Sequence, residues 1–106
     1  MKIEFDTNEY IKDISKGKSY FHTFINKENL AAGILRLESG EEDTQTPHES
    51  DEVYYVVRGD GFLKIGNKDY KVSEGMSYYV EKNIDHRFYG NQKELVVLYF
   101  FGGPDT

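Results

Sequence analysis

The sequence contains no cysteine, which excludes disulfides, iron–sulfur clusters and thiolate catalysis. His, Asp and Glu remain as the side chains suited to binding a metal ion. Basic residues are scarce, since 13 Lys and Arg stand against 19 Asp and Glu and give a formal net charge of −6. They form no cluster that would hold a phosphate backbone, so nucleic acid is excluded as a partner.

Long apolar runs are missing too. No stretch is long enough to cross a bilayer, and no basic-then-apolar leader opens the chain. We therefore expect a soluble cytoplasmic protein with no membrane partner. The 106 residues suffice for one core with one ligand cavity and are too few for two domains. Because no repeat, low-complexity segment or linker interrupts them, residues 1–106 are predicted to form a single domain.

One short helix is predicted near the N-terminus, over residues 8–16. Asp6 stands where a capping carboxylate belongs, and Gly17 can end the helix in a left-handed conformation. Ile11 and Ile14 lie on the same helical face between them. The pattern favours a lid or edge helix on an otherwise β protein.

The remainder reads as short strands separated by dense turn signals, such as Asn67 to Asp69 after Gly66. So many short antiparallel strands imply a sandwich or barrel, because an open sheet would leave long exposed edges. The fold class is therefore predicted to be all-β. The expected strands are Lys18–Asn26, Leu30–Glu38, Glu52–Arg58, Gly61–Ile65, Tyr70–Val72, Ser77–Val80, His86–Tyr89 and Glu94–Phe101.

Side chains alternate between the two faces of a strand. In the strand from Glu52, alternation predicts an inward set of Glu52, Tyr54, Val56 and Arg58. The opposite set is also apolar, which suggests a second covered surface such as a subunit contact. Sixteen aromatic residues, 9 Tyr and 7 Phe, exceed what one small barrel core needs. We therefore expect a homodimer.

Two histidines and a glutamate, His48, Glu52 and His86, stand at or just before predicted strands and are residue types that a divalent metal selects. Two imidazoles and one carboxylate on one face of an octahedral ion leave open positions for substrate and oxygen. Glu52 is hard to explain otherwise, because a carboxylate opening an apolar strand is costly to bury unless it is paired or ligated. The alternative is that His48 is a surface loop histidine beside Asp51 and Glu49 and that His86 is a histidine at a strand start, bonded to a neighbour.

The residues around His48 resemble the first motif of the cupins. That motif is Gly, five residues, His-x-His, three or four residues, Glu, six residues and Gly. In this chain Gly40, Thr46, His48, Glu52 and Gly59 fall at that spacing, with Thr46 in place of the first histidine. The second motif is carried by Ser73-x-Gly75, His86 and Gly90 or Asn91, with Ser73 and Glu81 in place of prolines.

This resemblance, from about Leu30 to Phe101, implies a double-stranded β-helix, a jelly-roll-like barrel with a metal in its mouth. It implies His48, Glu52 and His86 as ligands of a divalent transition metal, which is iron, manganese, nickel or zinc. It does not imply a particular reaction.

Four further residues are predicted to serve a small-molecule ligand or substrate. Gln45 has an oxygen that can reach the ion or a water bound to it. Phe88 lies on the same face as His86, and Arg58 can bind a substrate carboxylate if it faces the pocket. Tyr54 is the inward-facing candidate for catalytic acid–base chemistry, although a phenol is weak in that role.

Three functions remain open. The first is a metal-dependent, dioxygenase-like enzyme acting on a small organic substrate. The second is a non-catalytic barrel that binds a metal or a small ligand. The third is a metal-free structural barrel. The family analogy favours the first.

Overall fold

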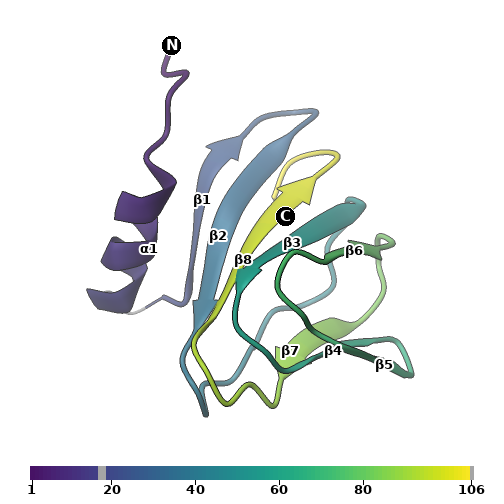
Figure 1. Ribbon diagram of the computed structural model, residues 1–106. Helices are drawn as coiled ribbons and strands as arrows, with labels where there is room; N and C mark the ends of the chain where they lie inside the picture. The colour runs from purple at the N-terminus through teal and green to yellow at the C-terminus, as the bar shows by residue number, and fades with distance from the viewer. Residues whose placement is uncertain (17–18, 106) are drawn as a thin grey trace.

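The computed structural model describes residues 1–16 and 19–105 (Figure 1). The helix predicted over residues 8–16 is confirmed as α1, Thr7–Lys16. The carboxylate of Asp6 accepts a hydrogen bond from the backbone nitrogen of Glu9 at 3.2 Å, which caps the helix as expected. The predicted stop at Gly17 and strand start at Lys18 lie outside the described residues. In the described part of the chain, no helix is long and apolar enough to span a membrane.

Within residues 1–16 and 19–105, eight strands form two antiparallel sheets that face each other (Figure 1). The large sheet has the order β1-β2-β8-β3-β6, with β1 Phe21–Asn26, β2 Ala31–Leu37, β8 Leu95–Phe101, β3 Glu52–Arg58 and β6 Ser77–Val80. The small sheet has the order β5-β4-β7, with β5 Lys68–Lys71, β4 Phe62–Ile65 and β7 His86–Tyr89. The predicted all-β class is confirmed, although the two sheets are not joined into a closed barrel.

Several strand ends differ from the prediction by one to three residues, and the difference in β5 has a clear cause in its turn. Ile65 pairs with Lys68, so Gly66 and Asn67 alone form the turn between β4 and β5. Strand β5 therefore begins at Lys68 and not at Tyr70. A two-residue hairpin needs positive φ, and Gly66 supplies it with a φ of 59°.

The inner faces of the two sheets enclose the main core. Tyr54 and Val56 of β3 are fully buried there, with Leu63 of β4 and Phe88 of β7 opposite. Helix α1 packs on the outer face of the large sheet, where Ile11 and Ile14 contact β2 and β8. Because β2 and β8 are covered on both faces, their sequences are apolar nearly throughout.

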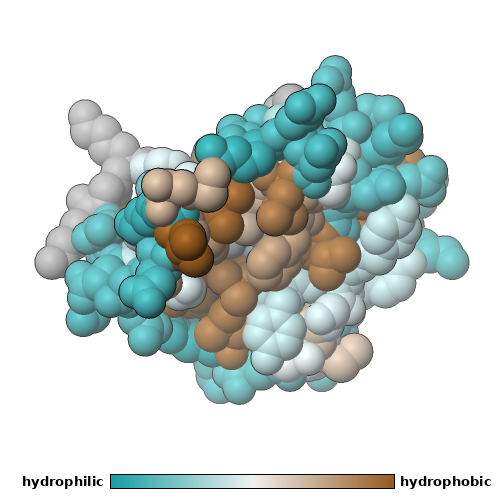
Figure 2. Space-filling view, turned by 90° about the horizontal axis from the view of Figure 1, so that it is seen from above, coloured by the Kyte–Doolittle hydropathy of each residue, from teal (hydrophilic) through white to brown (hydrophobic). Residues whose placement is uncertain are grey.

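Helix α1 leaves the outer face of β3 and its neighbours uncovered. Val53 and Tyr55 are 42% and 41% exposed, and Tyr79 and Phe100, which pair with Val53, are 60% and 39% exposed. Other apolar side chains reach the surface elsewhere, and Figure 2 shows hydrophobic residues gathered across the middle of the upper side of the molecule. The outward direction of Val53 and Tyr55 confirms the predicted alternation. The homodimer stays a prediction.

Alternation fails at the end of β3, where Arg58 was predicted to face inward with Glu52. Val56 pairs with Val97 of β8 but Arg58 pairs with Val96, so a β-bulge places one extra residue, Val57, in β3. A bulge breaks the period of two. The Arg58 side chain is therefore 48% exposed and pairs with Glu94 on the surface.

Candidate metal centre

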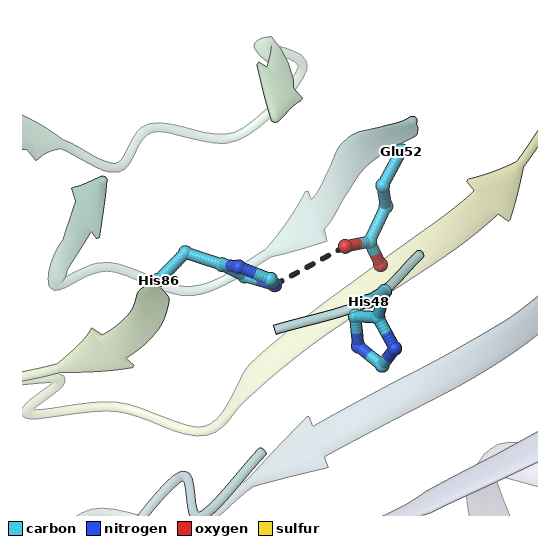
Figure 3. Close-up of side chains that lie close together, drawn as sticks. All are labelled: His48, Glu52 and His86. Atoms are coloured by element: carbon cyan, nitrogen blue, oxygen red, sulfur yellow. Dashed lines mark ion pairs between the residues drawn. The ribbon is translucent and has the colours of Figure 1, made fainter. Parts of the chain in front are cut away.

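The fold brings together the two imidazoles and the carboxylate that the sequence singled out. His48 comes from the loop before β3, Glu52 is the first residue of β3, and His86 is the first residue of β7 in the opposite sheet. One potential ligand atom of each residue lies within 4.8 Å of those of the other two. Figure 3 shows His86 and Glu52 pointing at each other with His48 beside them. The group thus joins the two sheets at one end of the sandwich.

Glu52 and His86 are buried without full hydrogen bonding. Their side chains are 3% and 2% exposed, and His86 Nε2 lies 3.2 Å from Glu52 Oε1. The two atoms are not aligned for a hydrogen bond, and neither has another partner. Burying such atoms is costly, so a buried pair of this kind calls for an explanation.

The His86 ring is held with Nε2 toward the centre. Its Nδ1 donates a hydrogen bond to the backbone oxygen of Ile84 at 2.9 Å. Burial alone would lower the pKa of the imidazole, but the Glu52 carboxylate and the Ile84 oxygen outweigh burial, so the pKa of His86 is raised. A backbone acceptor on Nδ1 is the arrangement that presents Nε2 to a metal ion.

His48 is fixed by its surroundings. Its ring packs against Phe101 with centroids 4.6 Å apart, and its backbone oxygen accepts a 2.7 Å hydrogen bond from Asn83. Its Nε2 lies 3.3 Å from Gln45 Oε1, and its Nδ1 lies 3.9 Å from Asp105 Oδ1. Both ring nitrogens therefore face oxygen atoms of the chain.

The three residues fit a divalent metal ion. Two ligand atoms on neighbouring corners of an octahedron are about 3.0 Å apart when each is about 2.1 Å from the ion. The 3.2 Å separation of His86 Nε2 and Glu52 Oε1 is close to this spacing. A cation would also give both atoms the partner that they lack. The role of His48, Glu52 and His86 as ligands stays a prediction.

Tyr54 lies on the same inner face as Glu52 and is fully buried. Its hydroxyl donates a 3.1 Å hydrogen bond to Gln45 Oε1. Burial, followed by the charges of Glu52 and Asp43, raises the pKa of this phenol well above its ordinary value. At neutral pH the group is therefore a hydrogen-bond donor.

A pocket of about 260 Å³ opens beside the centre. His48, Glu52 and Tyr54 contribute to its wall, as do Gln45 and Asp105. Its other walls are mainly apolar and aromatic, from Tyr20, Phe21, Leu35, Tyr99 and Phe101. A mainly apolar cavity with a few converging polar groups is the usual form of a small-molecule site.

Two residues predicted to contact a substrate lie elsewhere. Phe88 is 1% exposed and packs edge-on against Tyr54, with centroids 4.8 Å apart, so it supports the site from the core and does not line the pocket. Arg58 lies at the opposite end of β3 and also does not line it. The bulge at Val57 explains why the Arg58 side chain faces outward.

The sequence analysis missed Asp43, which is 5% exposed. Its carboxylate accepts hydrogen bonds from the Tyr20 hydroxyl, the Phe88 backbone nitrogen and the Gln45 side chain. This one group links β7 and the residue just before β1 to the loop that carries His48. Asp43 ends a run of three acidic residues, and nothing in such a run distinguishes the buried member.

The second motif was placed at the wrong residues. In the second cupin motif a glycine is followed by five residues, then Pro-x-Gly, and then the histidine. Counting from Gly75 puts Glu81-x-Asn83 at the Pro-x-Gly position, and His86 follows after two intervening residues. Asn83 has a φ of 64°, as the glycine of the motif requires, and Asn tolerates this conformation better than most residues. The spacing from Gly75 therefore indicates Asn83 and His86, whereas the predicted Ser73-x-Gly75 lies eight residues too early for Pro-x-Gly.

Comparison with known proteins identifies the family. The sequence profile of the cupin domain matches residues 33–101, which is more than half of the chain. The chain belongs to the cupin family. This confirms the resemblance and the fold class drawn from the sequence.

Relatives of this cupin are found among sequences and structures. An uncharacterised protein of Streptomyces coelicolor is 34% identical over 83 residues, which span 78% of this chain and 79% of that protein. The DMSP lyase DddQ of Ruegeria pomeroyi is similar with a TM-score of 0.71 at 16% identity, over 78% of this chain and 46% of that chain. KdgF from Halomonas sp. is similar with a TM-score of 0.70 at 20% identity, over 81% of this chain and 80% of that chain. At these identities the two structures show the fold alone.

Proposed function

We propose that this cupin is a metal-dependent enzyme of the dioxygenase-like kind, which acts on a small organic substrate at the His48, Glu52 and His86 centre. The observation that carries the proposal is the pair of buried, unsatisfied atoms, Glu52 Oε1 and His86 Nε2, beside a pocket. A barrel without a bound ion would gain nothing from this arrangement, because hydrophobic residues there would cost less.

The residues of the chain would hold the ion and shape the space around it. His48, Glu52 and His86 would bind a divalent transition metal, iron, manganese, nickel or zinc, since these donors suit all of them. Such an ion supplies Lewis-acid chemistry, and in the case of iron redox chemistry, at its open coordination positions. The aromatic walls exclude water from the substrate, and Tyr54 donates a fixed hydrogen bond beside it.

The pocket also indicates a class of substrate. Its two charged acidic groups are Glu52 and Asp105, and within the described part of the chain no Lys or Arg lines it. An anionic tail would find no cationic partner other than the ion itself. A volume of about 260 Å³ holds only a small molecule. We therefore propose a small, largely apolar substrate that is neutral or positively charged.

A non-catalytic metal- or ligand-binding barrel is the second candidate. The raised pKa of Tyr54 favours it, because the phenol stays protonated and is a poor general base at neutral pH. Chemistry carried by the metal alone would not need such a base, which is why the enzyme remains the first choice.

Metal content and oxygen uptake test the proposal. Elemental analysis of the purified protein should find about one transition-metal ion per chain, and His86→Ala should remove most of it. Oxygen consumption by the iron-loaded protein is then screened over small thiols and diols, with keto acids as the anionic comparison. Metal without oxygen uptake would favour the non-catalytic barrel, and a metal-free wild type would refute both.

A further inference from the structure

We propose that Gln45 supplies a fourth protein ligand to the ion through its side-chain oxygen, in place of the histidine that cupins carry where this chain has Thr46. The inference rests on the proposed metal-binding function and concerns one more residue of the same centre. Thr46 itself has a short side chain and is exposed. Gln45 is partly buried, and its side-chain oxygen lies beside His48.

The orientation of the Gln45 amide is fixed by Asp43. A carboxylate only accepts hydrogen bonds, so the 2.7 Å contact between Gln45 Nε2 and Asp43 Oδ2 places the NH₂ group on Asp43. Asp43 cannot easily move, because the Tyr20 hydroxyl and the Phe88 nitrogen each donate to it at 2.8 Å. The Gln45 oxygen is therefore turned away from Asp43 and toward the metal centre.

That oxygen has the partners expected of a ligand. Gln45 Oε1 lies 3.3 Å from His48 Nε2, again near the spacing of about 3.0 Å between neighbouring octahedral ligands. It also accepts the 3.1 Å hydrogen bond from the Tyr54 hydroxyl. An amide oxygen has two lone pairs, so Tyr54 can occupy one while the other faces the ion.

His48 can bind the ion in the same arrangement. With its proton on Nδ1, the ring presents an unprotonated Nε2 that can act as a ligand, and the protonated nitrogen faces Asp105 Oδ1 at 3.9 Å. The ion would then take the place of the Nε2 proton between His48 and Gln45. The four donor atoms belong to three segments of the chain: the loop before β3, β3 itself and β7.

Binding of Mn²⁺ to the full chain tests this assignment. Gln45→Leu keeps the size of the side chain but removes its oxygen, and should weaken Mn²⁺ binding about 10- to 100-fold in a chelator competition. Water should replace the lost ligand, so the solvent-proton relaxation of the Mn²⁺-loaded variant should show one more bound water than the wild type. A residue that only orients His48 would leave the number of bound waters unchanged.

Two further variants complete the experiment. Thr46→Ala is the matched control and should leave both affinity and water count unchanged, because the Thr46 side chain is not a ligand. Adding Thr46→His to Gln45→Leu should restore affinity, and circular dichroism checks that each variant is folded. Equal affinity and water count in wild type and Gln45→Leu would overturn the Gln45 assignment alone. A wild type that binds no Mn²⁺ or other transition metal would instead refute the proposed function.

Discussion

A carboxylate lies at each end of strand β3, and the two differ in their surroundings: Glu52 begins the strand, and Glu94 pairs with Arg58 at its other end. At its start, Glu52 is 3% exposed and faces His86 without an aligned hydrogen bond. At its other end, Arg58 donates to Glu94 from Nε at 2.9 Å and from Nη2 at 2.7 Å, while Arg36 also pairs with Glu94. The Glu52 carboxylate is buried and faces one imidazole without an aligned hydrogen bond, whereas the Glu94 carboxylate has two guanidinium partners near the surface.

The pKa of Glu94 reflects its two arginine partners. Burial alone would raise the pKa of the Glu94 carboxyl, but the hydrogen bonds and charges of Arg58 and Arg36 outweigh it and lower that pKa. Such a group stabilises the folded protein. Glu52 is more deeply buried and faces a single charged side chain, His86, whose Nε2 is not aligned with Glu52 Oε1 for a hydrogen bond. We infer that the Glu94 end holds the fold together and that the Glu52 end is kept for binding.

The sharpest test of this comparison is Glu52→Gln. Loss of the anionic ligand should weaken metal binding at least about 100-fold, measured by chelator competition. After chelator treatment, however, the variant should be no less stable than wild type in urea unfolding, because a poorly paired buried charge has been removed. A destabilisation above about 2 kcal/mol would mean that Glu52 and His86 form a structural ion pair, and the comparison would fail.

Much of the Glu52 end could be predicted from the sequence, because motif spacing and strand alternation both act locally. Gly40, His48, Glu52 and Gly59 stand at fixed intervals, and alternation placed Tyr54 beside Glu52 correctly. Such patterns identify which residues share a face. They do not show which atoms meet, so the link from Asp43 to Gln45 appears only in the structure.

The Arg58 end was predicted less well, for a physical reason. The bulge at Val57 depends on how β3 and β8 pair, and β8 begins 37 residues after Arg58 in the chain (95 − 58). Gly59 follows Arg58 and lets the chain pass close to the residues before β8, since a Cβ there would lie 2.5 Å from the Glu94 backbone oxygen. A glycine after a strand is ordinarily read as a turn, so the close approach of the two strands could not be recognised from the sequence.

Glu94→Gln is the counterpart at the paired end, with a smaller expected effect. Removing the charge takes away one of the two carboxylates beside Arg36, which is 16% exposed, and leaves Glu38 as the other. The free energy of unfolding at pH 7 should fall by about 2 kcal/mol. Metal content should not change. Urea unfolding with elemental analysis measures both, and a loss of metal without a loss of stability would reverse our assignment of the two ends.

The same variant has a defined pH dependence. Because the folded-state pKa of Glu94 is lowered, its stabilisation is fully present above the unfolded value of about 4.5 and is lost as the pH falls through the folded value. The difference in stability between wild type and Glu94→Gln should therefore be constant near neutral pH and shrink below about pH 4.5. A difference that persists at lower pH would show that the charge of Glu94 is not its source.

Tyr54→Phe probes the middle of β3, where the smallest change is expected. The hydroxyl donates one buried hydrogen bond to Gln45, so its removal should cost about 1 kcal/mol of unfolding free energy. Because the raised pKa keeps the phenol protonated at neutral pH, we expect any oxygen-uptake rate to fall less than about 10-fold. Removing a residue that transfers a proton in the reaction would lower the rate by about 100-fold or more. A rate loss of that size with stability retained would place Tyr54 among the catalytic residues, and the functional end of β3 would then extend from Glu52 to Tyr54.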